Sequence, residues 1–323
     1  MKRSTLIAAL TGCLFTCTLQ IATAGPLLDR LKERRAEHLN QDDESLFTDI
    51  GKDPDFVDEQ VSVTRNIAYG AENLQHFDRY APRHLTHAAP TIIMVHGGAW
   101  RTGDKAMSNV VANKVKRWVP QGVVFISVNY RLLPDADPAQ QAADVAKAIT
   151  YIQQHATQLA VDPSQVILMG HSAGAHLVSL LASDVQLQSK YQTKPWLATI
   201  ALDSAAYDIP EIMSHSHYRF YDSAFGKDPV YWQQNSPLLQ LEGKISPFLA
   251  ICSTTRPDKP CEQAEAFVKQ AKVLGNDATL LPEPMTHKEM NRDLGATFPY
   301  TTTVENFMRK QSENWAKALQ HLQ

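Results

Sequence analysis

The stretch that decides the fold runs from Val166 to Ala175 and reads VILMGHSAGA, and it is followed directly by HLVSLL. An apolar run breaks into a Gly-x-Ser-x-Gly pattern and then continues as an apolar helical pattern, which predicts a strand, a tight turn and a helix. Ser172 stands at the apex of the turn. Because a strained turn of this kind leaves no room for side chains two positions before and after the apex, Gly170 and Gly174 favour a nucleophilic serine.

The chain on both sides of this stretch alternates short apolar runs with helical patterns, which is typical of a parallel sheet buried on both faces. Helices are expected near residues 108–119, 138–159 and 303–322. The expected edge strands are 61–69 and 75–80, and the expected parallel strands are 91–96, 123–128, 166–169, 197–202, 248–252 and 278–281. The sequence therefore predicts an α/β fold with a mostly parallel, doubly wound sheet of eight strands and helices on both faces.

The N-terminal segment has a basic start, an apolar middle and a small-x-small end, which predicts a signal peptide over residues 1–24. A lipoprotein box ending at Cys13 is the alternative. Residues 25–60 form a charged leader, and residues 61–323 a single domain. Within this domain, the aromatic-rich connection at about 204–240 is too long for a simple crossover and is expected to act as a lid or a binding wall.

Charge and cysteine content restrict the classes of function. The chain of 323 residues has a net charge of −3, which becomes −5 if residues 1–24 are removed with Lys2 and Arg3. This balance excludes a typical nucleic-acid-binding protein, and no stable membrane span is expected. The same cleavage leaves only Cys252 and Cys261, and their spacing in an exported chain predicts a disulfide. Two free, buried thiols are the alternative.

A nucleophilic serine needs a base, and the base needs an acid that orients it. His287 follows the last expected strand and is the predicted base. Asp258 follows the strand ending at Cys252 and is the predicted acid. Asp203, which ends the preceding strand, and Asp208 remain open as alternatives.

Attack on a carbonyl group places negative charge on oxygen, and backbone N–H groups can stabilise this charge. The sequence His96-Gly97-Gly98-Ala99-Trp100 follows the first parallel strand directly. Its glycines allow the backbone to approach a substrate closely. Gly97, Gly98 and the residue after the nucleophile, Ala173, are therefore the candidate oxyanion-hole residues.

Three ordered motifs resemble those of the α/β-hydrolase esterases. They are residues 96–105 with HGGAW and GDK, residues 129–132 with NYRL, and residues 170–175 with GHSAGA. The resemblance covers about residues 60–320 and is strongest to hormone-sensitive-lipase-like esterases, feruloyl and acetyl-xylan esterases, and kynurenine formamidases. It implies the α/β-hydrolase fold, with Ser172, Asp258 and His287 as the triad. Ala99, where many relatives carry a third glycine, favours the feruloyl-esterase and formamidase side.

These observations predict an exported serine carboxylesterase, periplasmic or secreted, that acts on a small-molecule or polysaccharide-linked ester and needs no cofactor. An arylformamidase-type amide hydrolase and a non-catalytic binding domain are the alternatives. His215 and His217 lack further ligands at suitable spacing, so no metal site is expected. Arg131 is expected in a structural ion pair with Asp144. The sequence does not indicate the oligomeric state.

Overall fold

The computed structural model describes residues 59–296 and 299–322 of the chain. The predicted signal peptide at residues 1–24, the lipoprotein alternative at Cys13 and nearly all of the charged leader lie outside the described residues. The first described element is a strand that begins at Val61, where regular alternation begins in the sequence.

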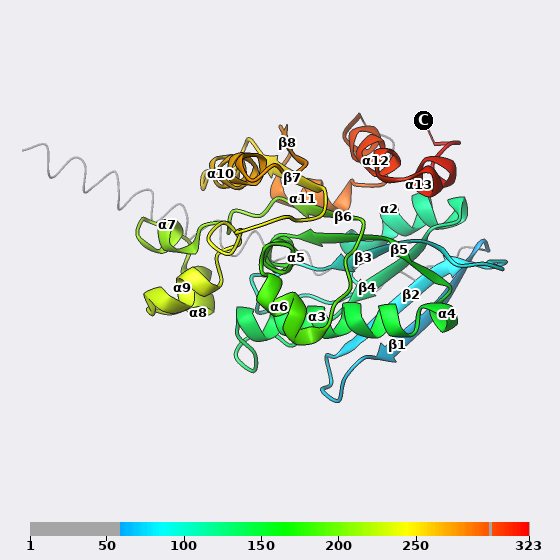
Figure 1. Ribbon diagram of the computed structural model, residues 1–323, viewed down its shortest axis with the longest axis horizontal. Helices are drawn as coiled ribbons and strands as arrows, with labels where there is room; N and C mark the ends of the chain where they lie inside the picture. The colour runs from blue at the N-terminus through cyan, green and yellow to red at the C-terminus, as the bar shows by residue number, and fades with distance from the viewer. Residues whose placement is uncertain (1–58, 297–298, 323) are drawn as a thin grey trace, which may run out of the picture.

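One sheet of eight strands organises the described chain, in the order β1-β2-β4-β3-β5-β6-β7-β8 (Figure 1). β1 and β2 pair antiparallel, as do β2 and β4, and every other neighbouring pair is parallel. The strands are β1 Val61–Ala68, β2 His76–Pro82, β3 Ala89–Val95, β4 Val124–Val128, β5 Val161–His171, β6 Ala198–Leu202, β7 Phe248–Ser253 and β8 Ala278–Glu283. The predicted α/β-hydrolase fold with a mostly parallel eight-stranded sheet is confirmed.

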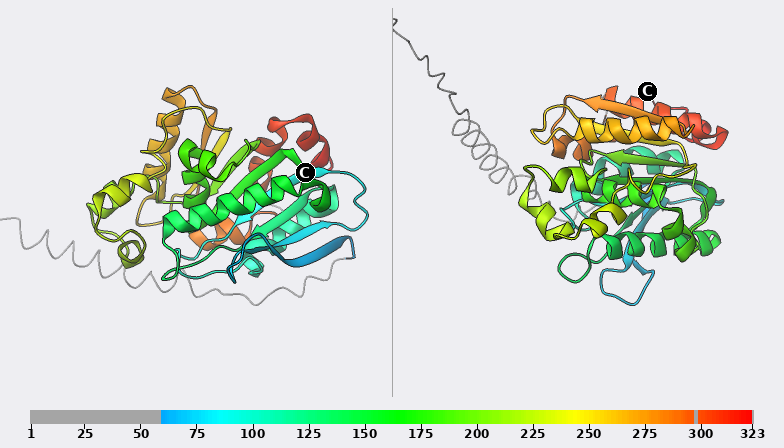
Figure 2. Two further views of the ribbon diagram at one scale, coloured as in Figure 1. Left: turned by 60° about the horizontal axis from the view of Figure 1, so that its bottom comes forward. Right: turned by 60° about the vertical axis from the view of Figure 1, so that its left-hand side comes forward.

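Helices fill the connections and cover both faces of the sheet (Figures 1 and 2). The main ones are α2 Ser108–Trp118, α3 Pro138–Gln154, α5 Ala173–Ser183, α10 Pro260–Val273 and α12 Pro299–Gln311. The shorter ones are η1 Val119–Gln121, α4 Ala156–Leu159, α6 Val185–Tyr191, α7 Ile209–Met213, α8 Arg219–Phe225, α9 Pro229–Gln234, α11 His287–Arg292 and α13 Glu313–Ala318. Within the described ranges, no helix combines the length and the apolar character needed to cross a membrane.

Two apolar cores lie on opposite faces of the sheet because successive strand residues point to opposite sides. In β3, Ile93 and Val95 join the core formed with α3, α5 and α10, whereas Ile92 and Met94 join the core formed with α2, α12 and α13. All residues of β4, β6 and β7 are buried, which explains their continuous apolar sequence.

Two predicted helices are interrupted in the structure. The helix expected over residues 138–159 ends at Gln154, and α4 follows as a separate turn. The C-terminal helix breaks at Ser312, whose hydroxyl accepts a hydrogen bond from the Trp315 amide and caps α13. The first break is a local change of backbone angles at His155 and the second is a side-chain cap, and apolar periodicity reveals neither.

The parallel strands bring distant parts of the chain to one edge of the sheet. β3, β5, β6, β7 and β8 all run in the same direction, so the segments that follow them meet at their C-terminal ends. The connection after β6 carries α7, α8 and α9, which gather at the same end of the molecule (Figure 1). The candidate site lies here.

Candidate active site

Ser172 lies at the apex of the turn between β5 and α5, with φ 55° and ψ −119°. This backbone conformation is costly for a residue that carries a side chain. A Cβ atom at Gly170 would lie 2.3 Å from the carbonyl oxygen of Gly174, and one at Gly174 would lie 2.2 Å from that of Val95. The structure therefore confirms that both flanking positions require glycine, and the tight turn raises Ser172 above the end of the sheet.

His287 is the first residue of α11, directly after the loop that follows β8. Thr286 caps the helix, and its hydroxyl and amide both contact the Glu289 carboxylate. The His287 carbonyl accepts a hydrogen bond of 3.0 Å from Nε2 of His171. Burial lowers the pKa of His171 well below its ordinary value, with a smaller contribution from the neighbouring His287. A neutral His171 thus links the turn of Ser172 to the loop of His287.

Asp203 is the acid that contacts His287. It follows β6, is fully buried, and places Oδ2 2.6 Å from His287 Nδ1. Its Oδ1 accepts a hydrogen bond of 2.8 Å from the Ser253 amide. Burial alone would raise the pKa of the Asp203 carboxyl, but the Arg256 guanidinium and the hydrogen bond from His287 outweigh it and hold this pKa well below its ordinary value. The carboxylate is therefore ionised and aligned with the imidazole.

Asp258 does not contact His287, so the prediction that Asp258 is the orienting acid is corrected. Its two carboxylate oxygens accept hydrogen bonds from Arg256, at 3.0 Å from Nε and 2.5 Å from Nη2. Arg256 itself contacts Asp203 and His287, and it separates Asp258 from the imidazole. The other alternative, Asp208, caps α7 by accepting from the Glu211 amide.

Sequence reasoning missed Arg256 entirely. The side chain is only 9% exposed and lies between two carboxylates. The available signal was weak, because an arginine in a turn-rich loop between Cys252 and Cys261 is ordinarily a solvated residue.

The turn after β3 lies against the nucleophile. A Cβ atom at Gly97 would lie 2.8 Å from Cβ of Ser172, so only glycine permits this approach. Gly98 has φ +122°, and its carbonyl oxygen accepts from the amides of Arg101 and Thr102. Ala99 and Ala173 line the same cavity as Ser172. The predicted oxyanion-hole segments therefore meet at the serine.

A set of buried hydrogen bonds holds this turn in place. Tyr130 donates to the carbonyl of His96 at 2.8 Å, and Gln141 donates to the carbonyl of Trp100 at 2.8 Å. The indole Nε1 of Trp100 donates to Nδ1 of His176 at 3.3 Å, and Nε2 of His176 in turn contacts the Asn235 carbonyl at 2.8 Å. Burial lowers the pKa of His176 to about 4, so this histidine is a neutral structural link.

The remaining motif residues are scaffolding. The Asn129 side chain accepts from the Lys105 amide at 2.6 Å, and the Lys105 ammonium lies 3.1 Å from the buried Asp78 carboxylate. Arg131 donates to both carboxylate oxygens of Asp144, at 2.7 and 2.8 Å, which confirms the predicted ion pair. These contacts fix the loops on which the site depends.

A cavity of about 20 Å³ lies over Ser172. It is lined by Ala99, Trp100, Ser172, Ala173, Asp203, Ser204, Ala205, Ala206, Phe220, Tyr221, Arg256 and His287. The residues that line this cavity thus come from five separate segments that follow strands of the sheet. Its aromatic side chains are Trp100 from the turn after β3 and Phe220 and Tyr221 from α8, in the long connection after β6.

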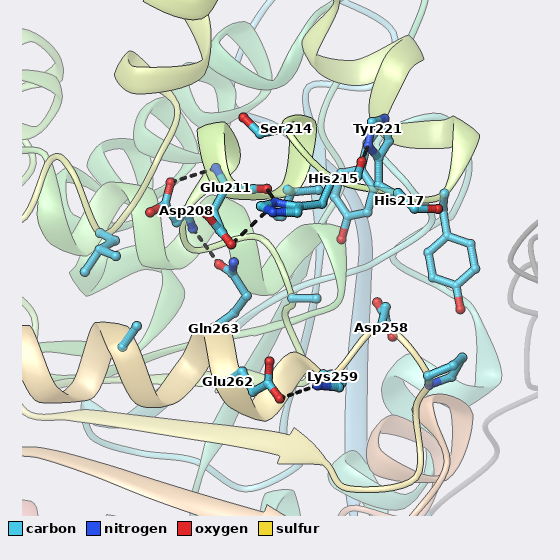
Figure 3. Close-up of a pocket in the computed structure, with 17 residues that line it drawn as sticks. Asp208, Glu211, Ser214, His215, His217, Tyr221, Asp258, Lys259, Glu262 and Gln263 are labelled. Atoms are coloured by element: carbon cyan, nitrogen blue, oxygen red, sulfur yellow. Dashed lines mark hydrogen bonds and ion pairs between the residues drawn. The ribbon is translucent and has the colours of Figure 1, made fainter. Parts of the chain in front are cut away.

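A larger pocket of about 890 Å³ adjoins this cavity (Figure 3). Ala205 and Tyr221 line both. The larger pocket is lined by polar side chains from α7, from the segment after it and from α10, including Glu211, His215 and Glu262. Because Ser172 does not line it, the smaller cavity marks the reacting centre. The larger pocket provides room beside it.

The sulfur atoms of Cys252 and Cys261 lie 2.01 Å apart at the two ends of the segment that carries Arg256 and Asp258. In residues 59–296 and 299–322, no three His, Cys, Asp or Glu side chains gather as a metal site would require. His215 contacts Glu211, and His217 contacts Asp222 at 3.3 Å.

Comparison with known sequences places this geometry in context. The sequence profile of the BD-FAE family matches residues 77–270, more than half of the chain. The chain is 25% identical over 248 residues to the probable isoprenylcysteine alpha-carbonyl methylesterase ICMEL1 of Arabidopsis thaliana, covering 71% of this chain and 51% of that protein. It is 30% identical over 149 residues to the kynurenine formamidase of Salmo salar, covering 46% and 48%. The chain thus spans about half the length of these curated relatives.

Comparison of structures gives the same fold. A truncated form of a carbohydrate esterase from gut microbiota superposes with a TM-score of 0.67 at 21% identity, covering 80% of this chain and 99% of that one. At this identity, the likeness shows a shared architecture.

Proposed function

Because the chain belongs to the BD-FAE family, we propose that it is a serine hydrolase that cleaves carboxylic esters through an acyl-enzyme intermediate. In this proposal Ser172 is the nucleophile, His287 the general base and Asp203 the acid that orients the imidazole. One observation carries it: Oδ2 of the buried Asp203 lies 2.6 Å from His287 Nδ1, in a cavity that Ser172 also lines.

The hydrogen bonds support the required proton positions. Asp203 is ionised and can only accept, so Nδ1 of His287 carries the proton and Nε2 is left free to accept one. Ser172 Oγ then attacks the ester carbonyl carbon while its proton passes to His287 Nε2. The imidazolium returns this proton to the departing alcohol. Water repeats the same steps on the acyl-enzyme and releases the carboxylic acid.

The oxyanion formed in each attack needs donors that are already in place. The strained turn at Ser172 and the turn at residues 97–99 meet beside the nucleophile. We assign the donors to backbone N–H groups of the 97–99 turn and to that of Ala173. Fixed donors of this kind contribute about 3 kcal/mol each to transition-state stabilisation.

The two cavities suggest where the acyl and the alcohol portions of a substrate bind. The cavity of about 20 Å³ over Ser172 has room for a group the size of one or two water molecules, which suits a formyl or acetyl group. The adjoining pocket of about 890 Å³ can hold a much larger alcohol portion. We therefore propose a short-chain ester of a bulky alcohol, either a small molecule or an acylated polysaccharide.

Labelling with a fluorophosphonate tests the nucleophile directly. The wild-type protein and Ser179→Ala, which removes a buried hydroxyl from the helix that follows Ser172, should each gain one adduct and hydrolyse p-nitrophenyl acetate. Ser172→Ala should do neither. A folded wild-type protein that neither reacts nor hydrolyses esters would overturn the proposal and favour a non-catalytic binding domain.

A formamide substrate is the second candidate, favoured by the similarity to the kynurenine formamidase and by the small cavity. The measurement that separates the two is kcat/KM for p-nitrophenyl acetate against that for N-formylkynurenine. A p-nitrophenyl series of increasing acyl length defines the acyl limit. Higher kcat/KM on N-formylkynurenine would make the chain an amide hydrolase.

We also propose that the chain is exported, that Cys252 and Cys261 form a disulfide in the mature protein, and that the segment at about 204–240 acts as a lid. The first two rest on the N-terminal sequence and on the position of the cysteines. N-terminal sequencing of protein recovered from the cell envelope or medium should begin near residue 25. Two thiols titrated after unfolding without reductant would rule out the disulfide.

A further inference from the structure

Arg256 bridges two carboxylates at the back of the candidate site. Its Nη1 donates to Asp203 Oδ2 at 2.9 Å and to the Asp203 carbonyl at 3.0 Å. Its Nε and Nη2 hold Asp258 in a paired contact. The guanidinium is almost fully buried, and its pKa is raised because the attraction of Asp203 and Asp258 outweighs the effect of burial. It is a permanent cation.

The same guanidinium lies against the imidazole. Arg256 Nη1 is 3.0 Å from His287 Nδ1, and both atoms lie within 2.9 Å of Asp203 Oδ2. Arg256 can only donate, and an unprotonated Nδ1 would face the ionised Asp203 oxygen as a second acceptor. Nδ1 therefore carries its proton, and two donors converge on one carboxylate oxygen. A fixed positive charge thus lies beside the general base.

We propose that Arg256 is a positioning residue that holds the Asp203 carboxylate and places a fixed positive charge beside His287, and that Asp258 holds Arg256 and offsets its charge. This inference rests on the proposed function, because it assumes that His287 acts as the base. A base must be unprotonated before each turnover, so a nearby cation extends activity to lower pH. Asp258, the acid expected from sequence, therefore acts on His287 only through Arg256.

The loop of Arg256 is tied to the loop of His287, which makes this geometry rigid. Ser253 Oγ donates to the Met285 carbonyl at 2.6 Å, and Thr255 Oγ1 donates to the same oxygen at 3.2 Å. The Thr254 amide donates to Glu283 at 3.0 Å. The cysteine sulfur atoms close the base of the same loop. These contacts hold the loop that carries Arg256 against the loop that carries His287.

Other titratable groups interact with the Asp203–His287 pair or with its neighbour His171, and they come from four elements. His171 ends β5 and is neutral, since its pKa is lowered by burial. Tyr221 of α8 and Tyr300 of α12 have raised pKa values because they are buried, so both stay neutral. Lys114 of α2 has its pKa lowered to about 7 by burial. All four are retained in the variants below, so their contributions cancel between wild type and variant.

The two charges predict opposite effects on the pH profile of kcat/KM for p-nitrophenyl acetate. Arg256→Met removes the cation and should move the midpoint of the acid limb upward by about one pH unit. Asp258→Asn leaves the cation without its partner and should move it downward by about half a unit. Arg256→Lys should restore part of the first shift. The control Arg292→Met, which removes an exposed cation from α11, should leave the midpoint unchanged.

The opposite signs distinguish electrostatics from loosened packing. A midpoint that stays in place in a folded Arg256→Met protein, or shifts that have the same sign in both variants, would overturn the inference. If Arg256→Met does not fold, Asp258→Asn tests the proposal by itself, because the Asp258 side chain is partly exposed and its replacement should be tolerated. An unmoved midpoint in Asp258→Asn would then contradict the proposal. A wild-type protein without ester turnover or labelling at Ser172 would instead overturn the proposed function.

Discussion

Replacing Asp203 by asparagine should nearly abolish turnover. The carboxylate accepts from the Ser253 amide at 2.8 Å, from His287 Nδ1 at 2.6 Å and from Arg256 Nη1 at 2.9 Å. An asparagine has one acceptor oxygen and one NH₂ group at this position. If the NH₂ group takes the place of Oδ1, it faces the Ser253 amide, which can only donate. If it takes the place of Oδ2, it faces Arg256, which can only donate, and His287, which must then give up the proton on Nδ1.

The second outcome moves the imidazole proton to Nε2, which then cannot accept the proton of Ser172. The loss of kcat for this exchange in a serine triad is about 10⁴-fold, which corresponds to about 5.5 kcal/mol of transition-state free energy. KM should change far less, because Asp203 lies behind the imidazole and away from the leaving group.

The assay is steady-state hydrolysis of p-nitrophenyl acetate, with the fraction of reactive Ser172 counted by fluorophosphonate titration and the fold checked by circular dichroism. Asp258→Asn is the matched comparison, and it should retain kcat within about tenfold of wild type because its partner is Arg256. The reasoning is refuted if Asp203→Asn stays within tenfold while Asp258→Asn loses a thousandfold. That result would make Asp258 the acid that orients His287.

Four further changes test other parts of the structure. Gly174→Ala places a methyl group 2.2 Å from a backbone carbonyl oxygen and should lower the free energy of unfolding by about 3 kcal/mol or more, as measured by urea denaturation. The folded protein holds His176 neutral with a pKa of about 4 against an ordinary 6.5. Unfolding then takes up a proton, so His176 should contribute a fall in stability of about 3 kcal/mol between pH 7 and 4. His176→Gln should remove this contribution from the same titration and leave that of His171. Reduction of the Cys252–Cys261 pair should cost about 2 to 3 kcal/mol, and equal urea midpoints with and without reductant would contradict this. Phe220→Ala enlarges the cavity over Ser172 and should raise the butyrate-to-acetate ratio of kcat/KM about tenfold; an unchanged ratio would place the acyl group elsewhere.

Most of the fold could be predicted because its signals are local. Each buried strand is a short apolar run, so the strands and their mostly parallel arrangement were expected from the sequence. The strand order itself is a result of the structure. The break at Ser312 was missed because capping depends on an individual side-chain hydrogen bond. The break at His155 was missed because it is a local change of backbone angles that apolar periodicity does not reveal.

The serine and the histidine were also predictable from local sequence. Gly170 and Gly174 identify Ser172, because a Cβ atom at either position would meet a backbone oxygen of the turn or of β3. His287 follows the last strand after a short loop, so its place at the sheet edge depends on chain order alone. The structure brings both to one cavity.

The acid could not be read in the same way. Asp203 follows β6 and Asp258 follows β7, and these neighbouring parallel strands bring both residues to the same edge of the sheet. Which carboxylate reaches the imidazole depends on the loop between β7 and α10, where Arg256 lies between Asp258 and His287.

The sequence by itself therefore determined the sheet, the serine turn and the segments around it, because backbone sterics and hydrophobic periodicity act within a few residues. Only the tertiary structure decided which acid contacts His287 and gave Arg256 a place beside it. Those contacts join residues 31 to 84 positions apart, and their geometry follows from how neighbouring loops pack.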